Sequence, residues 1–226
     1  AKNRDFNGNV LIAENGKIVY EKSFGYADFP SKRLNAKNTV FPFASISKSI
    51  MATAILQQVE KGNLRLDERA AKYLPEFPYA ELTIKNLLSH TSGMPAYGAF
   101  FEKFRKENPE RVFTNADFIW GLNANKQPLI YKPGESWNYD NTNFVVLALI
   151  LEKVSGENHV EYVKKHILEP AGMNDTFFFQ NLFDANKNKI KSLVIPHLFP
   201  RVYSDSPIRA DSIEYVSSYW KSYHFS

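Results

Sequence analysis

A short apolar run that leads directly into an amphipathic helix is the feature that most constrains how this chain can fold. Residues 41–44 are mainly apolar, and apolar side chains then recur at three- and four-residue spacing up to Gly62, a common helix stop signal. The pattern predicts a helix over residues 45–61. Ser45 and Lys48 stand three positions apart at its start, so both side chains project from one face of the first turn.

A hydroxyl beside an amine at a helix N-terminus can act as an activated nucleophile. The Lys48 amine can take the proton of Ser45, and the positive end of the helix dipole stabilises the alkoxide that forms. The ordinary alternative is a helix start with a solvated lysine. Ser218 and Lys221 show the same spacing, so the pair has to be judged together with other motifs.

The composition is that of a globular chain with a full hydrophobic core. Of its 226 residues, 44% are hydrophobic and 15% aromatic, which fits one large domain or two intimate subdomains. We predict a single domain over residues 1–226. No run of about 18 apolar residues is present, so no membrane-spanning helix is predicted. The net charge of +4 is small and the lysines are scattered, which gives no support to nucleic-acid binding.

Cysteine and metal-binding motifs contribute nothing to the predicted chemistry. The absence of cysteine excludes disulfides, thiol catalysis and cysteine-ligated zinc. The five histidines form no HExxH motif, and there is no glycine-rich phosphate loop and no GxSxG elbow. We therefore expect acyl transfer without a metal or another cofactor.

The N-terminal part of the chain predicts a β-hairpin over residues 8–27. Two apolar strands flank Asn15-Gly16, the strongest short-range signal for a tight hairpin turn. Because two strands are not stable alone, they must join a larger sheet or pack on helices. After a loop at 28–42, residues 64–170 have a mainly helical pattern, and residues 181–226 cannot be assigned.

Local signals mark the helices of this region. Two threonines each precede a periodic apolar stretch, as expected for helix starts. A Ser-Gly pair follows a third apolar stretch, as expected for a helix end. The predicted helices are 84–88 after Thr83, a helix through Leu122 after Thr114, 143–154 before Ser155-Gly156, and 157–168. The third of these is almost continuously apolar, which predicts that it is buried.

Two further clusters of polar residues carry candidate chemistry. Tyr139-Asp140-Asn141 stands in a polar turn directly before the buried helix, where an aromatic residue followed by an Asx N-cap is the ordinary alternative. Ser89-His90-Thr91-Ser92-Gly93 contains a serine and a histidine, but adjacent residues rarely face each other as a catalytic triad requires. For His90 we favour a role in structuring the loop.

Taken in order, these motifs resemble the serine β-lactamase and penicillin-binding protein superfamily, specifically its class C-like branch of β-lactamases, DD-peptidases and related esterases. The resemblance covers residues 8 to about 180 and rests on several motifs in the family's order. The motifs are Phe43-Ala44-Ser45-Ile46-Ser47-Lys48, Leu87-Leu88-Ser89-His90-Thr91-Ser92-Gly93-Met94-Pro95, Tyr139-Asp140-Asn141 with Thr142-Asn143-Phe144-Val145-Val146-Leu147, the Asn15-Gly16 hairpin with Phe24-Gly25-Tyr26-Ala27-Asp28, and Leu168-Glu169-Pro170-Ala171-Gly172-Met173.

The resemblance implies an α+β fold of the β-lactamase/transpeptidase type, in which an antiparallel sheet packs with a mainly helical subdomain. It also implies roles for four residues. Ser45 would attack an amide, ester or β-lactam carbonyl, Lys48 would accept or relay the serine proton, and Tyr139 would act as the partner base. Asn141 would orient Lys48 and bind the amide side chain of the substrate.

The sequence departs from the family towards its C-terminal end. The family has a third motif, Lys-Thr-Gly or His/Lys-x-Gly, on a strand near its C-terminus, whereas Gly172 is the last glycine of this chain. That strand also supplies the second oxyanion-hole N–H and completes the sheet against the hairpin. We therefore expect a chain that is incomplete at its C-terminus, with an open sheet edge that can pair with another chain.

The substrate stays open among β-lactams, D-Ala peptides and esters. Asp140 stands where Ser or Ala is commoner in the family, and its negative charge tilts the expectation towards esters. Two alternatives to an active enzyme remain, a non-catalytic homologue that binds peptidoglycan or peptides, and an inactive fragment of an active parent. Because the sequence opens without Met or a signal peptide, a leader removed by processing would fit a periplasmic or secreted location.

Overall fold

The computed structural model describes residues 6–95, 97–108, 114–178, 192–194, 197–198 and 208–209. The chain forms two compact units, one made of residues 1–43 with 181–221 and the other of residues 44–180 with 222–226. The single domain over 1–226 stays a prediction. Most of the unassigned stretch 181–226 lies outside the described residues, and so does the second Ser-x-x-Lys spacing at Ser218.

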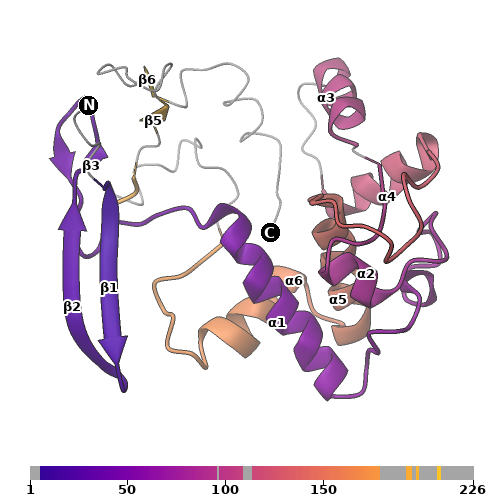
Figure 1. Cartoon of the computed structure of the whole chain (residues 1–226), viewed down its shortest axis with the longest axis horizontal. Helices are drawn as coiled ribbons and strands as arrows, with labels where there is room; N and C mark the ends of the chain where they lie inside the picture. The colour runs from indigo at the N-terminus through magenta and orange to yellow at the C-terminus, as the bar shows by residue number, and fades with distance from the viewer. Residues whose placement is uncertain are drawn as a thin grey trace. The chain divides into compact units, whose positions relative to one another are not determined.

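The first unit contains the predicted hairpin. Strands β1 (Gly8–Glu14) and β2 (Lys17–Phe24) pair antiparallel and are the two long arrows of Figure 1. Asn15 and Gly16 both have positive φ, at 49° and 75°, which matches the right-handed twist of the strands. A register shift at Ile12/Ala13 marks a bulge.

Apolar side chains of this hairpin are exposed on both strands. Five of them are 42–58% exposed, namely Leu11, Ile12, Ile18, Val19 and Tyr20. Among the residues that the structure describes, β1 and β2 pair only with each other. Within the described residues, the hairpin therefore presents two strand edges that pair with no other strand, together with exposed apolar side chains.

Smaller strand pairs complete the described part of this unit. Strand β3 (Tyr26–Asp28), at the end of the predicted hairpin range, pairs with β4 (Arg33–Leu34), which lies where the sequence predicts a loop. Strand β5 (His197–Leu198) pairs with β6 (Ile208–Arg209). Val40 also pairs in parallel with Leu193, through backbone hydrogen bonds of 3.0 and 2.9 Å. All the named strand pairs are antiparallel, which fits the predicted α+β class.

The second unit is helical and is built around α5 (Thr142–Ser155). Nine of the fourteen residues of α5 are buried, because the stretch is almost continuously apolar. Helix α5 contacts four other helices and, with Met51 and Ile55 of α1, belongs to one hydrophobic core. The other elements, seen in Figure 1 where labelled, are η1 (Ala44–Ile46), α1 (Ser47–Glu60), η2 (Ala70–Lys72), α2 (Ile84–Leu88), α3 (Gly98–Glu107), α4 (Asn115–Ala124), α6 (His159–Val163) and the π-helical turn η3 (Lys164–Leu168).

The helix ends follow the local signals in the sequence. Thr83 and Thr114 both cap their helices, with Asn86 and Asp117 closing the two capping boxes. Gly156 ends α5 in the left-handed conformation at φ 72°. None of the described helices is both long and apolar enough to span a membrane.

Three local details differ from the sequence prediction. The helix expected from residue 45 begins as the 3₁₀ turn η1, and α1 itself starts at Ser47. The helix expected over 157–168 is divided into α6 and the π-helical turn η3. Helix α3 has no counterpart in the sequence prediction, because no capping residue precedes it. Its aromatic side chains pack on other elements, as the Phe101 ring does by stacking on that of Phe118 at a centre-to-centre distance of 4.0 Å.

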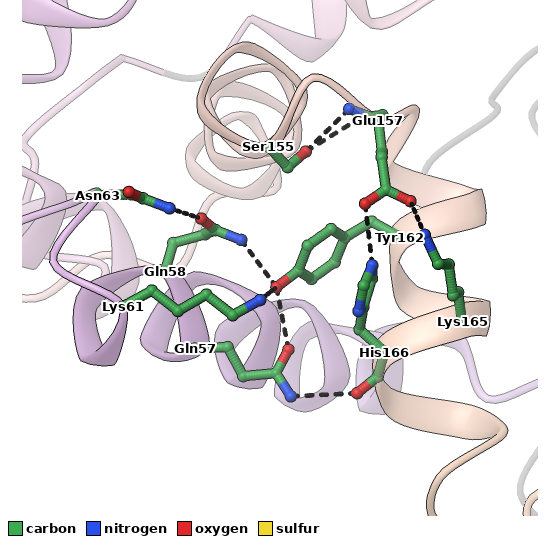
Figure 2. Close-up of polar contacts among 9 residues, drawn as sticks. All are labelled: Gln57, Gln58, Lys61, Asn63, Ser155, Glu157, Tyr162, Lys165 and His166. Atoms are coloured by element: carbon green, nitrogen blue, oxygen red, sulfur yellow. Dashed lines mark hydrogen bonds and ion pairs between the residues drawn. The ribbon is translucent and has the colours of Figure 1, made fainter.

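A buried tyrosine joins the C-terminal half of α1 to α6 and η3 (Figure 2). The Tyr162 hydroxyl accepts hydrogen bonds from Gln58 Nε2 at 2.7 Å and Lys61 Nζ at 3.2 Å, and donates to Gln57 Oε1 at 3.1 Å. Gln57 Nε2 in turn donates to the carbonyl oxygen of His166. Since Tyr162 is only 1% exposed, this network satisfies polar groups that would otherwise be costly to bury.

We expect Tyr162→Phe to lower the free energy of unfolding by about 1–3 kcal/mol, because it leaves the amides of Gln57 and Gln58 and the Lys61 amine without their shared partner. Urea denaturation followed by circular dichroism measures the change. Tyr131→Phe is the matched control, since the buried Tyr131 hydroxyl has no hydrogen-bond partner in the described structure. Its removal should be neutral or stabilising, and equal losses in both variants would contradict the assigned role.

Candidate active site

Ser45, Lys48 and Tyr139 lie together in the second unit. Ser45 Oγ and Tyr139 Oη are 2.6 Å apart, in a hydrogen bond that either hydroxyl can donate, although the residues are 94 positions apart in sequence. Lys48 Nζ donates to Ser45 Oγ at 3.3 Å. The structure thus joins three of the four residues singled out in the sequence into one hydrogen-bonded group.

The start of α1 positions the serine and the lysine. Ser45 lies in the 3₁₀ turn η1 and Lys48 in the first turn of α1, so the three-residue spacing still places both on one side. The Lys48 ammonium lies 5.3 Å from the centre of the Tyr139 ring and 5.7 Å from that of Phe144. Both aromatic faces attract the cation and hold it beside the hydroxyl pair.

The surroundings of Tyr139 lower the pKa of its phenol. Burial by itself raises this pKa, but hydrogen bonding with Lys48 and Ser45 and the positive charge of Lys48 outweigh burial and the opposing charge of Asp140. The phenolate is therefore formed at lower pH than in free tyrosine, whose pKa is about 10. The residue as a whole is 43% exposed, so Tyr139 lies at the surface of the unit and not in its core.

Asn141 and Asp140 take positions at the start of α5. Asn141 is the residue before the helix, and its Oδ1 is buried without a hydrogen-bond partner in the part of the chain that the structure describes. No hydrogen bond between Asn141 and Lys48 is found there. The Asp140 carboxylate accepts a hydrogen bond from the Thr142 N–H at 2.6 Å, so it is engaged in starting the helix.

The loop of residues 89–95 runs beside the segment that leads to Tyr139. Gly93 has a φ of +71°, and a Cβ there would lie 2.4 Å from the carbonyl oxygen of Tyr131, so this close approach requires glycine. Three backbone hydrogen bonds join the two segments: Ile130 N–H to Gly93 at 2.8 Å, Gly134 N–H to Thr91 at 2.8 Å, and Asn138 N–H to His90 at 2.9 Å.

His90 belongs to this loop and not to a catalytic triad. Its side chain is 9% exposed, and its ring lies 4.6 Å from the Tyr139 ring. No hydrogen bond links His90 to Ser45 within the described ranges. The favoured role in loop structure agrees with these contacts. Sequence reasoning missed the contact with Tyr139, for which the only signal was the presence of both motifs in one chain.

Two other histidines, His159 and His166, make local pairs. His159 Nδ1 lies 2.6 Å from a carboxylate oxygen of Glu152, and His166 Nε2 lies 2.9 Å from one of Glu157. Among the residues that the structure describes, no three His, Cys, Asp or Glu side chains gather as a metal site would require. Most of the chain after residue 178 lies outside the described residues. The expectation that the strand carrying the family's third motif is missing from this chain therefore remains a prediction.

Comparison with known proteins identifies the class. The α+β fold, with a serine and a lysine beside a tyrosine, is the arrangement that the resemblance predicts for the β-lactamase and penicillin-binding protein superfamily. The Beta-lactamase family profile matches residues 5–188, so the chain belongs to the Beta-lactamase family.

Individual relatives support this membership. Penicillin-binding protein 4* of Bacillus subtilis (strain 168) is 42% identical over 171 residues, which are 76% of this chain and 38% of that protein. An octameric penicillin-binding protein homologue from Pyrococcus abyssi has a TM-score of 0.71 at 31% identity, covering 89% of this chain and 46% of that one. EstCE1, described as a hydrolase with promiscuous acyltransferase activity, has a TM-score of 0.72 at 27% identity, covering 89% of this chain and 54% of that one. This chain thus spans less than two thirds of each relative.

We predict that Tyr139 titrates below the ordinary tyrosine pKa of about 10 and that Lys48→Met raises its midpoint, because the variant removes a hydrogen bond and a positive charge. Nuclear magnetic resonance of ¹³Cζ-labelled tyrosine, with Tyr139→Phe to assign the signal, measures both midpoints. Tyr73 is the internal control, since burial and its hydrogen bond to Glu68 raise its pKa to about 12. A Tyr139 titration midpoint above the ordinary tyrosine value of about 10, or a midpoint that is the same in Lys48→Met as in the parent, would contradict this electrostatic account.

Proposed function

We propose that the protein is a serine hydrolase that forms an acyl-enzyme on Ser45 from an amide, ester or β-lactam carbonyl. The observation that carries the proposal is the 2.6 Å hydrogen bond between Ser45 Oγ and Tyr139 Oη, with Lys48 Nζ 3.3 Å from the same serine oxygen. A nucleophile within reach of a base, with a third group that orients the pair, is the arrangement that covalent catalysis requires.

In the acylation step, Tyr139 in its phenolate form takes the proton of Ser45 as Oγ bonds to the carbonyl carbon. The carbonyl electron pair moves to oxygen and gives a tetrahedral oxyanion. The Lys48 ammonium, which donates to Oγ, stabilises the negative charge while the proton moves. When the intermediate collapses, the bond to the leaving group breaks, and that group takes the proton from Tyr139.

Deacylation repeats these steps with water. Tyr139, again a phenolate, takes a proton from a water molecule that attacks the acyl carbon. As the ester bond breaks, Tyr139 passes this proton to Ser45 Oγ, which restores the serine hydroxyl and the phenolate. The backbone N–H of Ser45 belongs to the second residue of the turn η1 (Ala44–Ile46), and the first N–H groups of a helix lack intrahelical partners. It is our candidate for one oxyanion-hole donor, a type of group whose loss typically costs about 10²–10³ in rate.

The proposed substrates share a carbonyl group that Ser45 attacks, in an amide, an ester or a β-lactam. We keep Asn141 as the proposed contact for an N–H group of a peptide or β-lactam side chain, since its Oδ1 has no hydrogen-bond partner among the described residues. The Asp140 carboxylate lies near enough to oppose ionisation of Tyr139, which keeps the proposed preference for esters over carboxylate-bearing substrates. The relatives include proteins named as a penicillin-binding protein and as a hydrolase with acyltransferase activity, so both classes should be tested.

Two further proposals concern the surroundings of the protein. Among the residues that the structure describes, β1 and β2 pair with no further strand and carry exposed apolar side chains, which supports strand pairing with another chain. Sedimentation should then show association of the parent and less association of an Ile18→Lys variant. A periplasmic or secreted location stays a prediction from the sequence.

We expect intact-mass spectrometry to show a covalent adduct after incubation with a fluorophosphonate or with a penicillin. Ser45→Ala should abolish the adduct, because it removes the attacking oxygen. Ser49→Ala is the matched control, since Ser49 is an exposed serine one helical turn further along α1, and it should label like the parent. An adduct that persists in Ser45→Ala would overturn the nucleophile assignment.

The role of Tyr139 is tested separately. Tyr139→Phe should slow adduct formation by about 10²–10⁴-fold, the usual range for a general base, and unchanged labelling would remove Tyr139 from the mechanism. Which probe reacts distinguishes ester hydrolysis from penicillin recognition. Penicillin bound without an adduct would favour a non-catalytic binder, and neither binding nor an adduct would favour an inactive fragment.

A further inference from the structure

His90 contacts the backbone on both sides of Tyr139. Its carbonyl oxygen accepts a hydrogen bond from the Asn138 N–H at 2.9 Å. Its ring nitrogen Nδ1 accepts one from the Asp140 N–H at 3.3 Å. A single residue of the 89–95 loop therefore binds the residue before the candidate base and the residue after it.

The imidazole ring also packs against two aromatic rings. Its centre lies 4.6 Å from that of Tyr139 and 5.3 Å from that of Phe144, with interplanar angles of 33° and 37°. Because Phe144 belongs to the buried helix α5, the ring connects the Tyr139 phenol to the hydrophobic core. Packing of this kind limits the freedom of the tyrosine side chain.

The hydrogen bonds require a particular tautomer. Asn143 Nδ2 lies 3.2 Å from His90 Nδ1 and also donates to the Asp140 carbonyl oxygen at 3.1 Å. Since that carbonyl oxygen can only accept a hydrogen bond, the amide nitrogen of Asn143, and not its oxygen, faces both groups. His90 Nδ1 is therefore an acceptor, and the proton of the neutral imidazole ring is assigned to Nε2. Protonation of Nδ1 would set an N–H against two donors.

The environment keeps the ring neutral. Burial lowers the pKa of His90, and the positive charge of Lys48 lowers it further, against smaller opposing effects of Asp140. The ring is therefore uncharged at neutral pH, and Nδ1 remains available as an acceptor. With Nδ1 occupied by Asp140 and Asn143, this nitrogen is not a base for Ser45.

The backbone of His90 is held in an uncommon conformation. Its φ is +55°, in the left-handed region that few non-glycine residues adopt. The end of α2 imposes this turn, since the N–H groups of His90 and Thr91 donate to the carbonyl oxygens of Leu87 and Asn86. The loop thereby fixes both groups of His90 that contact the Tyr139 segment.

We propose that His90 is a positioning residue for Tyr139: its Nδ1 and its carbonyl oxygen hold the peptide groups on both sides of Tyr139, so that the phenol oxygen stays within hydrogen-bonding distance of Ser45 Oγ. This proposal rests on the proposed function, in which Tyr139 exchanges a proton with Ser45. His90 itself touches no reacting atom.

Three variants distinguish the role of the hydrogen-bond acceptor of His90 from the role of its aromatic ring. His90→Asn places Oδ1 at the position of Nδ1 and tolerates left-handed φ well. His90→Phe keeps an aromatic ring against Tyr139 and Phe144 but has no acceptor. His90→Gly removes the whole side chain, keeps the carbonyl group and adopts positive φ without strain, so it replaces the phenylalanine variant if that protein does not fold. Thermal unfolding of each variant shows whether the fold is retained.

The first readout is the Tyr139 midpoint by ¹³Cζ-tyrosine nuclear magnetic resonance, which needs no activity. We expect it to rise in His90→Phe and His90→Gly, because the phenol oxygen moves away from Ser45 and Lys48, and to stay near the parent value in His90→Asn. An unchanged midpoint in folded His90→Phe or His90→Gly would overturn the proposal, as would an equal rise in His90→Asn.

The second readout is the rate at which a fluorophosphonate labels Ser45. We expect His90→Phe to label about 10- to 100-fold more slowly, the scale of a misplacement of about 1 Å, and His90→Asn to recover most of the rate. Tyr139→Phe serves as the reference. If Tyr139→Phe slows labelling but folded His90→Phe does not, only the positioning role fails; if Tyr139→Phe has no effect, the proposed function itself fails.

Discussion

Burial of α5 against α1 is the interaction on which the candidate site depends. Helix α5 is almost continuously apolar, and its buried side chains share one core with Met51 and Ile55 of α1. Each fully buried side chain of this kind contributes about 1.5–3 kcal/mol, so the contact is far stronger than any single hydrogen bond of the site. Because Ser45 and Lys48 lie at the start of α1 and Tyr139 directly before α5, the same packing brings the three polar groups together.

Hydrogen bonds outside this core further fix the positions of α1 and of the segment that carries Tyr139. At the far end of α1, the buried Tyr162 network ties the helix to α6 and η3 (Figure 2). At the near end, backbone hydrogen bonds from the 89–95 loop hold the segment that leads to Tyr139. Helix α1 and Tyr139 are therefore each held by contacts beyond the core, as a site needs when hydrogen-bond distances have to be kept within a few tenths of an ångström.

One positive charge organises the electrostatics of the site. The Lys48 ammonium donates to Ser45, lies over the rings of Tyr139 and Phe144, lowers the pKa of Tyr139 and opposes protonation of His90. These effects act in the same direction, since they favour an anionic phenol beside a neutral imidazole. Membership of the Beta-lactamase family provides the chemical context in which such a group can transfer an acyl group.

The sequence by itself determined the features that depend on local backbone preference. The Asn15-Gly16 turn, the caps at Thr83 and Thr114, the glycine end of α5 and the burial of that helix all follow from neighbouring residues. Motif order also indicated the family and the residues Ser45, Lys48 and Tyr139.

Only the tertiary structure decided how these residues meet. The contact of His90 with Tyr139 arises from packing between segments far apart in the chain. Whether Asn141 Oδ1 finds a hydrogen-bond partner also depends on which groups the fold brings near it, and among the described residues it finds none. Periodicity and capping signals reach only a few residues along the chain, whereas the distance between Ser45 and Tyr139 is set by how α1, α5 and the loop between them pack.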